Sequence, residues 1–139
     1  SLSQKVADKL FKNDCIFLVG EIGVGKTTFT RYLINYLQKK NGEKITEVLS
    51  PTFNLLYEYD LKRIKIMHYD LYRIRDEKEL KQLGIFLDNQ DTIKIIEWPQ
   101  LINIPLSDKL EIHLDYVKNE KEREIKFIGS GKWKTLNEL

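Results

Sequence analysis

A glycine-rich segment between an apolar run and an amphipathic stretch constrains this chain more than any other feature. Residues 20–27 read Gly-Glu-Ile-Gly-Val-Gly-Lys-Thr, which satisfies the P-loop pattern of a glycine, any four residues and Gly-Lys-Thr. Chance matches occur in roughly one of two hundred chains of this length at average residue frequencies. The unbroken apolar run 15–19 is typical of a strand covered on both faces, and residues 27–40 carry one apolar stripe at helical spacing. The pattern therefore predicts a strand, a phosphate-binding loop and a helix in that order.

The residue types in this loop suit a phosphate group. Gly20, Gly23 and Gly25 permit positive φ and let backbone N–H groups approach phosphate oxygens, and the helix N-terminus adds further donors. Lys26, expected in a solvent-facing loop, has the reach to contact β- and γ-phosphates, and the Thr27 hydroxyl is a ligand for Mg²⁺. The alternative is a glycine turn with a purely structural role. The flanking strand and helix argue against that alternative.

Two acidic residues end predicted strands. Glu97 follows the apolar run 93–96, and Asp70 ends the alternating segment 64–70. Because ligands of open α/β sheets bind at the carboxyl ends of the strands, we expect Glu97 to hold a metal or to orient a water molecule. Asp70 is the second candidate for this role. By position alone, Glu97 can also be a strand cap, and an acid in the place of Asp70 is more often a turn residue.

Three other side chains have structural interpretations. His68 lies two residues before Asp70 and is expected to pack or to form a structural hydrogen bond rather than to bind a metal. Trp98 and Trp133 are more often core or interface aromatics than platforms on which a base stacks.

Short helices and strands are predicted around the P-loop unit. Alternation and turn residues predict two antiparallel pairs, and the spacing of Asp76 and Glu79 predicts a capped helix that ends at Gly84. The expected elements are a helix over 3–11, a strand over 47–49, paired strands over 54–59 and 64–70, a strand over 92–97 and a solvent-facing hairpin over 110–116 and 125–128. Together they predict an α/β fold of the P-loop NTPase type, with central parallel strands, flanking antiparallel strands and helices on both faces.

Composition narrows the class of protein further. The chain has 139 residues, which suits a single domain over 1–139, and 42% hydrophobic with 32% charged residues is typical of a globular protein. The formal net charge is only +2, so we do not expect the chain to bind a nucleic acid through its overall field. A single cysteine, Cys15, excludes an internal disulfide, and no apolar run approaches the ~20 residues of a membrane span. We therefore expect a cytoplasmic protein with no membrane partner.

Four segments carry a resemblance to a known family. They are Gly-Glu-Ile-Gly-Val-Gly-Lys-Thr-Thr-Phe at 20–29, Ser-Pro-Thr-Phe at 50–53, His-Tyr-Asp-Leu-Tyr-Arg at 68–73 and Ile-Glu-Trp-Pro at 96–99. In this order they closely resemble the TsaE (YjeE) family of bacterial P-loop ATPases, and the resemblance extends over essentially the whole chain. Val24 stands where that family usually has alanine, a departure that removes no polar group from the site.

The resemblance implies an ATP-binding and ATP-hydrolysing protein required for the threonylcarbamoyl modification of the adenosine beside the anticodon of certain tRNAs. The implied partners are the TsaD and TsaB proteins; the transfer chemistry belongs to TsaD, and tRNA is contacted only through the complex. The implied cofactors are ATP and Mg²⁺. The implied activity is a weak Mg²⁺-dependent ATPase that its partners activate.

The resemblance also implies roles for particular residues. It implies catalytic roles for Lys26, Asp70 and Glu97, and a metal site at Thr27, Asp70 and Glu97. Thr52, within the Ser-Pro-Thr segment, matches a nucleotide-sensing switch. The residues expected to contact the nucleotide are Gly20, Gly23, Val24, Gly25, Lys26, Thr27, Thr28, Thr52 and Trp98.

Two other functions are compatible with a P-loop on a small α/β domain. A small-molecule kinase needs a lid that clamps the transferred phosphoryl group, and the chain has no evident arginine-rich segment of that kind. A module that binds a nucleotide as a conformational ligand without hydrolysing it does not need the acids at 70 and 97. Phosphate release to water without an acceptor distinguishes a hydrolase from the kinase, and single-turnover hydrolysis with partners distinguishes it from the module.

Overall fold

The computed structural model of this protein describes residues 2–21, 25–86, 91–103, 108–116 and 123–138. Its helices are α1 (Leu2–Lys9), α2 (Lys26–Lys40) and α3 (Glu77–Leu83), with the 3₁₀ helices η1 (Pro99–Leu101) and η2 (Gly131–Glu138). Its strands are β1 (Cys15–Val19), β2 (Leu56–Asp60), β3 (Lys65–Asp70), β4 (Thr92–Glu97), β5 (Lys109–Tyr116) and β6 (Arg123–Gly129). Over these ranges, no helix has the length and apolar character needed to cross a membrane.

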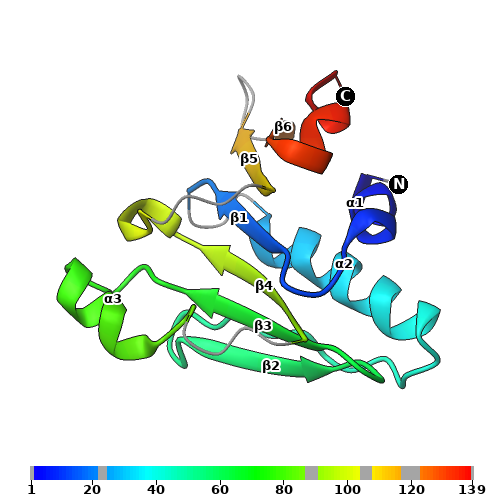
Figure 1. Cartoon of the computed structure of the whole chain (residues 1–139), viewed down its shortest axis with the longest axis horizontal. Coiled ribbons are helices and arrows are strands. Elements are labelled where there is room, and N and C mark those ends of the chain that lie inside the picture. The colour runs from blue at the N-terminus through cyan, green and yellow to red at the C-terminus, as the bar shows by residue number, and fades with distance from the viewer. Residues whose placement is uncertain (1, 22–24, 87–90, 104–107, 117–122, 139) are drawn as a thin grey trace.

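The strands of the described ranges form one mixed sheet in the order β2-β3-β4-β1-β5-β6 (Figure 1). Strands β3, β4, β1 and β5 run parallel at its centre, and β2 and β6 pair antiparallel at its two edges. β1 has a parallel neighbour on each side, which agrees with its unbroken apolar sequence, because a central parallel strand buries both faces. The topology confirms the predicted α/β class, in which antiparallel strands flank a parallel centre.

Helices cover both faces of the sheet. On one face, α1, α2 and η2 pack against a core that includes Ile16 and Leu18 of β1. On the other face, Leu80 of α3 packs against a second core that includes Cys15 and Phe17. Figure 1 shows α2 behind the sheet and α3 beyond the arrowheads of β3 and β4. Alternate residues of β1 thus enter different cores, as the period of two in a strand requires.

The predicted strand over 47–49 is wrong. Residues 43–50 follow α2 without strand pairing. Two side chains of α2 form hydrogen bonds with the backbone of Thr46. Asn35 Nδ2 donates to the Thr46 carbonyl at 3.1 Å, and the Thr46 N–H donates to Gln38 Oε1 at 3.2 Å. Because these bonds satisfy the backbone locally, this segment is tied to the helix rather than to the sheet.

The C-terminal hairpin is paired as predicted but does not face solvent on both sides. β5 pairs antiparallel with β6, and it also pairs parallel with β1, which places it inside the sheet. Leu110 and Ile112 are fully buried in the same core as Trp133 of η2, so Trp133 takes the core role, one of the two structural roles expected for it. Alternation indicates a strand with one buried face, but it does not indicate which segment covers that face. Here the covering segment is η2, which follows β6 along the chain.

The short helix α3 forms as predicted. Its N-cap is Asp76, whose Oδ1 accepts a hydrogen bond from the N–H of Glu79 at 2.9 Å. Glu79 Oε2 in turn accepts from the N–H of Arg75 at 3.0 Å, and the helix ends at Gly84. The first bond satisfies a donor that the first helical turn leaves without a partner, and the second ties the residue before the N-cap to the helix.

The reactivity of Cys15 tests whether the central strand β1 is buried. Cys15 is 3% exposed, and burial raises the pKa of its thiol to about 12. Because the thiolate is the reactive form, we expect the native protein at pH 8 to react with Ellman's reagent orders of magnitude more slowly than the chain unfolded in urea. Absorbance measures both rates, and the unfolded chain, with its one cysteine, should release one equivalent of chromophore. Rapid labelling of the native protein would contradict this burial.

Candidate active site

The predicted phosphate loop and the two acids meet at the carboxyl ends of the central strands. β1 leads into Gly20, β3 ends at Asp70 and β4 ends at Glu97. Parallel pairing aligns Asp70 with Glu97 across β3 and β4, and Leu18 with Glu97 across β1 and β4. Residues far apart in the chain therefore share one edge of the sheet, next to Lys26 at the start of α2.

The N-terminus of α2 presents backbone donors that its N-cap residue, a glycine, has no side chain to cap. The N-cap is Gly25, whose φ of 106° lies in the left-handed region that favours glycine. The N–H of Phe29 donates to the Gly25 carbonyl at 2.9 Å as the first bond of the helix. The N–H groups before Phe29 and the helix dipole favour an anion, so a phosphate group fits this end of α2. Gly23 and Val24 of the predicted loop lie outside the described residues.

Lys26 is buried in the site, so its expected place in a solvent-facing loop is wrong. Its side chain is 6% exposed; Nζ donates to the Gly20 carbonyl at 2.7 Å and lies 3.9 Å from Glu97 Oε1. Nζ also lies 4.1 Å from the centre of the Trp98 ring, a cation–π contact. Burial lowers the pKa of Lys26, and the charges of Glu97 and Asp70 oppose that shift. The lysine is buried because residues from neighbouring strand ends close over it.

Asp70 connects two loops of the site. Its Oδ2 accepts a hydrogen bond from the Thr52 hydroxyl at 2.9 Å, and its Oδ1 accepts from the N–H of Tyr72 at 2.9 Å. The hydroxyl oxygens of Ser50 and Thr52 lie 2.8 Å apart, which extends the chain of contacts. Asp70 therefore shapes the turn after β3, as the turn interpretation supposed, and also fixes the Ser-Pro-Thr segment to that turn.

Glu97 divides its two oxygens between different partners. Oε2 lies 2.7 Å from His68 Nε2, and Oε1 faces Lys26. The structural hydrogen bond expected of His68 is therefore made to one of the two predicted catalytic acids. Trp98 follows with a φ of 58°, which is uncommon for a residue with a side chain and recurs at functional sites.

One pocket of about 230 Å³ gathers most of the predicted site residues. Its lining consists of Gly25, Lys26, Thr27, Thr28, Ser50, Thr52, Asp70, Glu97 and Trp98. Gly20 contributes the carbonyl that bonds Lys26. The oxygens of Thr27, Asp70 and Glu97 are of the hard type that Mg²⁺ prefers. Within the described ranges no three His, Cys, Asp or Glu side chains form a metal site by themselves, so these oxygens fit a Mg²⁺ that also takes phosphate or water ligands.

Two contributors to this site are not among the residues predicted from the sequence. Ser50 lines the pocket, and Tyr72 donates its N–H to Asp70 while its ring lies 4.9 Å from that of Trp98. Both lie in segments that carry the family resemblance, and this is the sequence signal by which they could have been identified. Their roles depend on the turns after the Ser-Pro dipeptide and after β3, which the sequence pattern does not specify.

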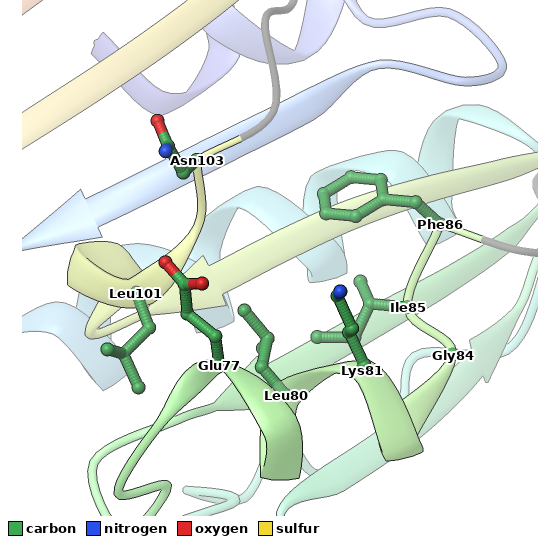
Figure 2. A pocket seen from close by; sticks show the side chains of 8 residues that line it. All are labelled: Glu77, Leu80, Lys81, Gly84, Ile85, Phe86, Leu101 and Asn103. Carbon is green, nitrogen blue, oxygen red and sulfur yellow. The ribbon is translucent and has the colours of Figure 1, made fainter.

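A second pocket lies apart from this site, between α3 and η1 (Figure 2). It has a volume of about 310 Å³ and is lined by Glu77, Leu80, Lys81, Gly84, Ile85, Phe86, Leu101 and Asn103. None of the predicted site residues lies in this lining. We therefore place the candidate active site at the carboxyl ends of β1, β3 and β4.

The sequence is similar to proteins of one family. The family model described as Threonylcarbamoyl adenosine biosynthesis protein TsaE matches residues 1–125. The Rickettsia conorii protein named tRNA threonylcarbamoyladenosine biosynthesis protein TsaE is 37% identical over 121 residues, which are 86% of this chain and 67% of that protein. The Bacillus subtilis protein of the same name is 34% identical over 120 residues, which are 85% of this chain and 71% of that protein.

The fold is also similar to that of a solved protein. The crystal structure of Bacillus subtilis YdiB matches with a TM-score of 0.69 and 26% identity, and the match covers 99% of this chain and 82% of that chain. The mixed sheet is therefore an architecture already observed by experiment. Because the family model spans residues 1–125 and relatives bearing its name are identical at more than a third of the aligned positions, the chain belongs to the TsaE family of threonylcarbamoyl adenosine biosynthesis proteins.

Proposed function

We propose that this chain is a P-loop ATPase, acting as one domain over residues 1–139, that binds ATP with Mg²⁺ and hydrolyses it in support of tRNA threonylcarbamoylation. The observation that carries this proposal is the meeting of Lys26, Asp70 and Glu97 at the N-terminus of α2, where the N-cap residue is a glycine. Family membership supports the place in threonylcarbamoyladenosine biosynthesis. The proposed partners are the TsaD and TsaB proteins; TsaD performs the transfer, and tRNA is contacted only within the complex.

Lys26 and the first turn of α2 bind the phosphates in this proposal. The ammonium has three N–H donors, and the Gly20 carbonyl takes one of them, so donors remain for a β- or γ-phosphate oxygen. Burial strengthens the attraction between the ammonium and the phosphates because the local dielectric is low. Thr28 and Trp98 belong to the same pocket lining and restrict the space around the phosphates.

Thr27, Asp70 and Glu97 hold the metal or orient the attacking water. When bound, Mg²⁺ neutralises negative charge that develops on the phosphates. Carboxylates at strand ends are suited to this position because Mg²⁺ in phosphate sites is usually held by one or two carboxylates together with phosphate oxygens. The contact between Glu97 and His68 fixes one carboxylate oxygen and leaves the other facing the pocket.

Thr52 links the site to a segment that a partner can reach. Its hydroxyl holds Asp70, while the neighbouring Phe53 is 79% exposed. A partner that binds this exposed segment would change the position of Asp70 and thereby the competence of the site. Binding energy of this kind selects a conformation that the free protein rarely populates. We therefore propose that the isolated chain hydrolyses ATP slowly.

The TsaB–TsaD pair is expected to raise ATP turnover by about tenfold or more, and an arginine supplied by a partner raises turnover by ~10³–10⁵ in related P-loop enzymes. Stimulation should disappear in Thr52→Ala, which lacks the hydroxyl that holds Asp70, while calorimetry should still detect ATP binding. Thr52→Ser keeps a hydroxyl and should remain stimulated. Phosphate release to water, measured without any acceptor, reports turnover for all three chains.

Two results would contradict this proposal. Rapid hydrolysis by the isolated chain that the partners leave unchanged would identify an independent ATPase. Phosphate transfer to a small-molecule acceptor, with no release to water, would identify a kinase instead.

A further inference from the structure

His68 and Glu97 form a buried pair, and Glu97 is one of the residues that line the phosphate pocket. His68 is 0% exposed, and the Glu97 side chain is 4% exposed. The register of β3 and β4 aligns His68 with Ile95 and Asp70 with Glu97. Because residues two apart on a strand point to the same face, His68, Asp70 and Glu97 share the face on which α2 packs with Ile95.

The hydrogen bond between His68 and Glu97 indicates which ring nitrogen carries a proton, and it uses only one of the two carboxylate oxygens. A carboxylate oxygen only accepts hydrogen bonds, so His68 Nε2 donates to Glu97 Oε2 across 2.7 Å. Glu97 Oε1 then faces Lys26 Nζ at 3.9 Å. That separation is too long for a hydrogen bond, so the ammonium and the carboxylate stay apart although both are buried.

Packing alone does not explain an imidazole at this place. His68 Nδ1 is buried and has no hydrogen-bond partner among the residues that the structure describes. A buried polar atom without a partner destabilises a fold. Leucine would fill similar space without that cost, so the histidine is explained by what Nε2 does to Glu97.

We propose that His68 is a positioning residue that holds Glu97 away from Lys26. This inference rests on the ATPase function proposed above. Without the bond from His68, Glu97 is free to close onto the Lys26 ammonium. That closure would take a cation from the phosphates and a carboxylate oxygen from the metal or the attacking water. With the bond, Lys26 stays available to phosphate and Glu97 Oε1 stays in the pocket.

A double-mutant cycle on ATP affinity separates this role from packing. The probe is ATP without Mg²⁺, measured by calorimetry, so the readout needs neither hydrolysis nor partners. His68→Leu should weaken ATP binding about tenfold or more, because Glu97 would then compete with the phosphates for the Lys26 ammonium; the loss of a residue that orients a metal ligand, a comparable case, costs about 10–100-fold. In a Glu97→Gln background the competitor for Lys26 is neutral, so adding His68→Leu should have little further effect. An equal loss in both backgrounds, or no loss in either, would overturn the inference.

Two amides at position 68 supply a matched comparison. Glutamine can place its Nε2 near the site of the imidazole Nε2, whereas asparagine is one carbon shorter and leaves Glu97 without a donor. His68→Gln should therefore retain ATP affinity, turnover with the partners and the ratio of kcat to KM far better than His68→Asn. Equal behaviour of the two variants would refute positioning by Nε2.

A measurement on the wild-type chain tests the inference even if the His68 variants fail to fold. The ¹H–¹⁵N spectrum of the His68 ring should show the proton on Nε2, and a proton on Nδ1 alone would overturn the inference. If the wild-type chain binds ATP but its complex does not hydrolyse it, the proposed function fails while the affinity cycle still tests His68. If the complex hydrolyses ATP and the cycle shows no coupling, only the inference about His68 fails.

Discussion

Glu97→Gln and Asp70→Asn are each expected to lower ATP turnover, in the presence of the TsaB–TsaD pair, by about 10²–10³-fold, the usual cost of removing one electrostatic contact to the transition state. Each substitution keeps the shape of the side chain and removes its charge. A neutral amide attracts Mg²⁺ less strongly and orients a water less effectively than a carboxylate does. Single-turnover hydrolysis measures the loss directly, without interference from product release.

Both variants should fold and bind ATP, because the surrounding hydrogen bonds tolerate an amide. In Glu97→Gln, the amide oxygen can accept from His68 in place of Oε2. In Asp70→Asn, the amide oxygen can accept from the Tyr72 N–H, and the Thr52 hydroxyl can rotate to accept from the new NH₂ group. Loss of turnover with nearly unchanged ATP affinity is therefore the expected signature of both substitutions.

Glu124→Gln is the matched control, since Glu124 is an exposed acid on the edge strand β6. It should change neither turnover nor ATP affinity. Normal hydrolysis by Asp70→Asn in the active complex would limit Asp70 to its role in the turn after β3. Normal hydrolysis by Glu97→Gln would remove Glu97 from the catalytic assignment.

Lys26→Met is expected to weaken ATP binding by about 10–100-fold, since hydrogen bonds from a charged group contribute roughly 1.5–3 kcal/mol. Methionine has a similar length and no charge, so the change removes the ammonium and largely keeps the space filled. The unfolding temperature without nucleotide should change little. The substitution loses the hydrogen bond to the Gly20 carbonyl. It also removes a charged group whose burial is unfavourable, as the lowered pKa of Lys26 indicates, so the two effects on stability oppose each other.

Lys39→Met serves as the control for Lys26→Met because Lys39 is an exposed lysine in the last turn of the same helix. Its ATP affinity should equal that of the wild type. Calorimetry gives the affinities and thermal unfolding gives the stabilities. Unchanged ATP affinity in Lys26→Met would remove the phosphate-binding assignment of the loop, and a large fall in unfolding temperature would assign the lysine to the fold instead.

Local patterns were sufficient for the elements that carry the phosphate loop. Five apolar residues mark β1, helical spacing with two lysines in the last turn marks α2, and the Asp76–Glu79 spacing marks α3. In each case the signal and the bonds it predicts lie within a few residues, so little else in the chain bears on the result. The positions of the two acids at strand ends were predictable for the same reason.

Patterns failed where the outcome depended on a distant partner. Residues 47–49 have strand-like composition, but Asn35 and Gln38 of α2 take the backbone bonds of Thr46 nearby. β5 and β6 alternate as an exposed hairpin would, yet one face is buried beneath η2. The free energy that decided both cases comes from contacts that no short window of sequence contains.

The sequence by itself determined the chemical groups of the site and their order along the chain, together with the family resemblance that these segments carry. Tertiary structure alone decided how the groups act on one another. The Thr52 hydroxyl holds an Asp70 that is 18 residues away, and His68 donates to a Glu97 that is 29 residues away. The bond between His68 and Glu97 requires the parallel pairing of β3 and β4, which also places Asp70 beside Glu97 at one sheet edge. Burial beneath these strand ends then lowers the pKa of Lys26, because desolvation depends on what packs around a side chain and not on its neighbours in sequence.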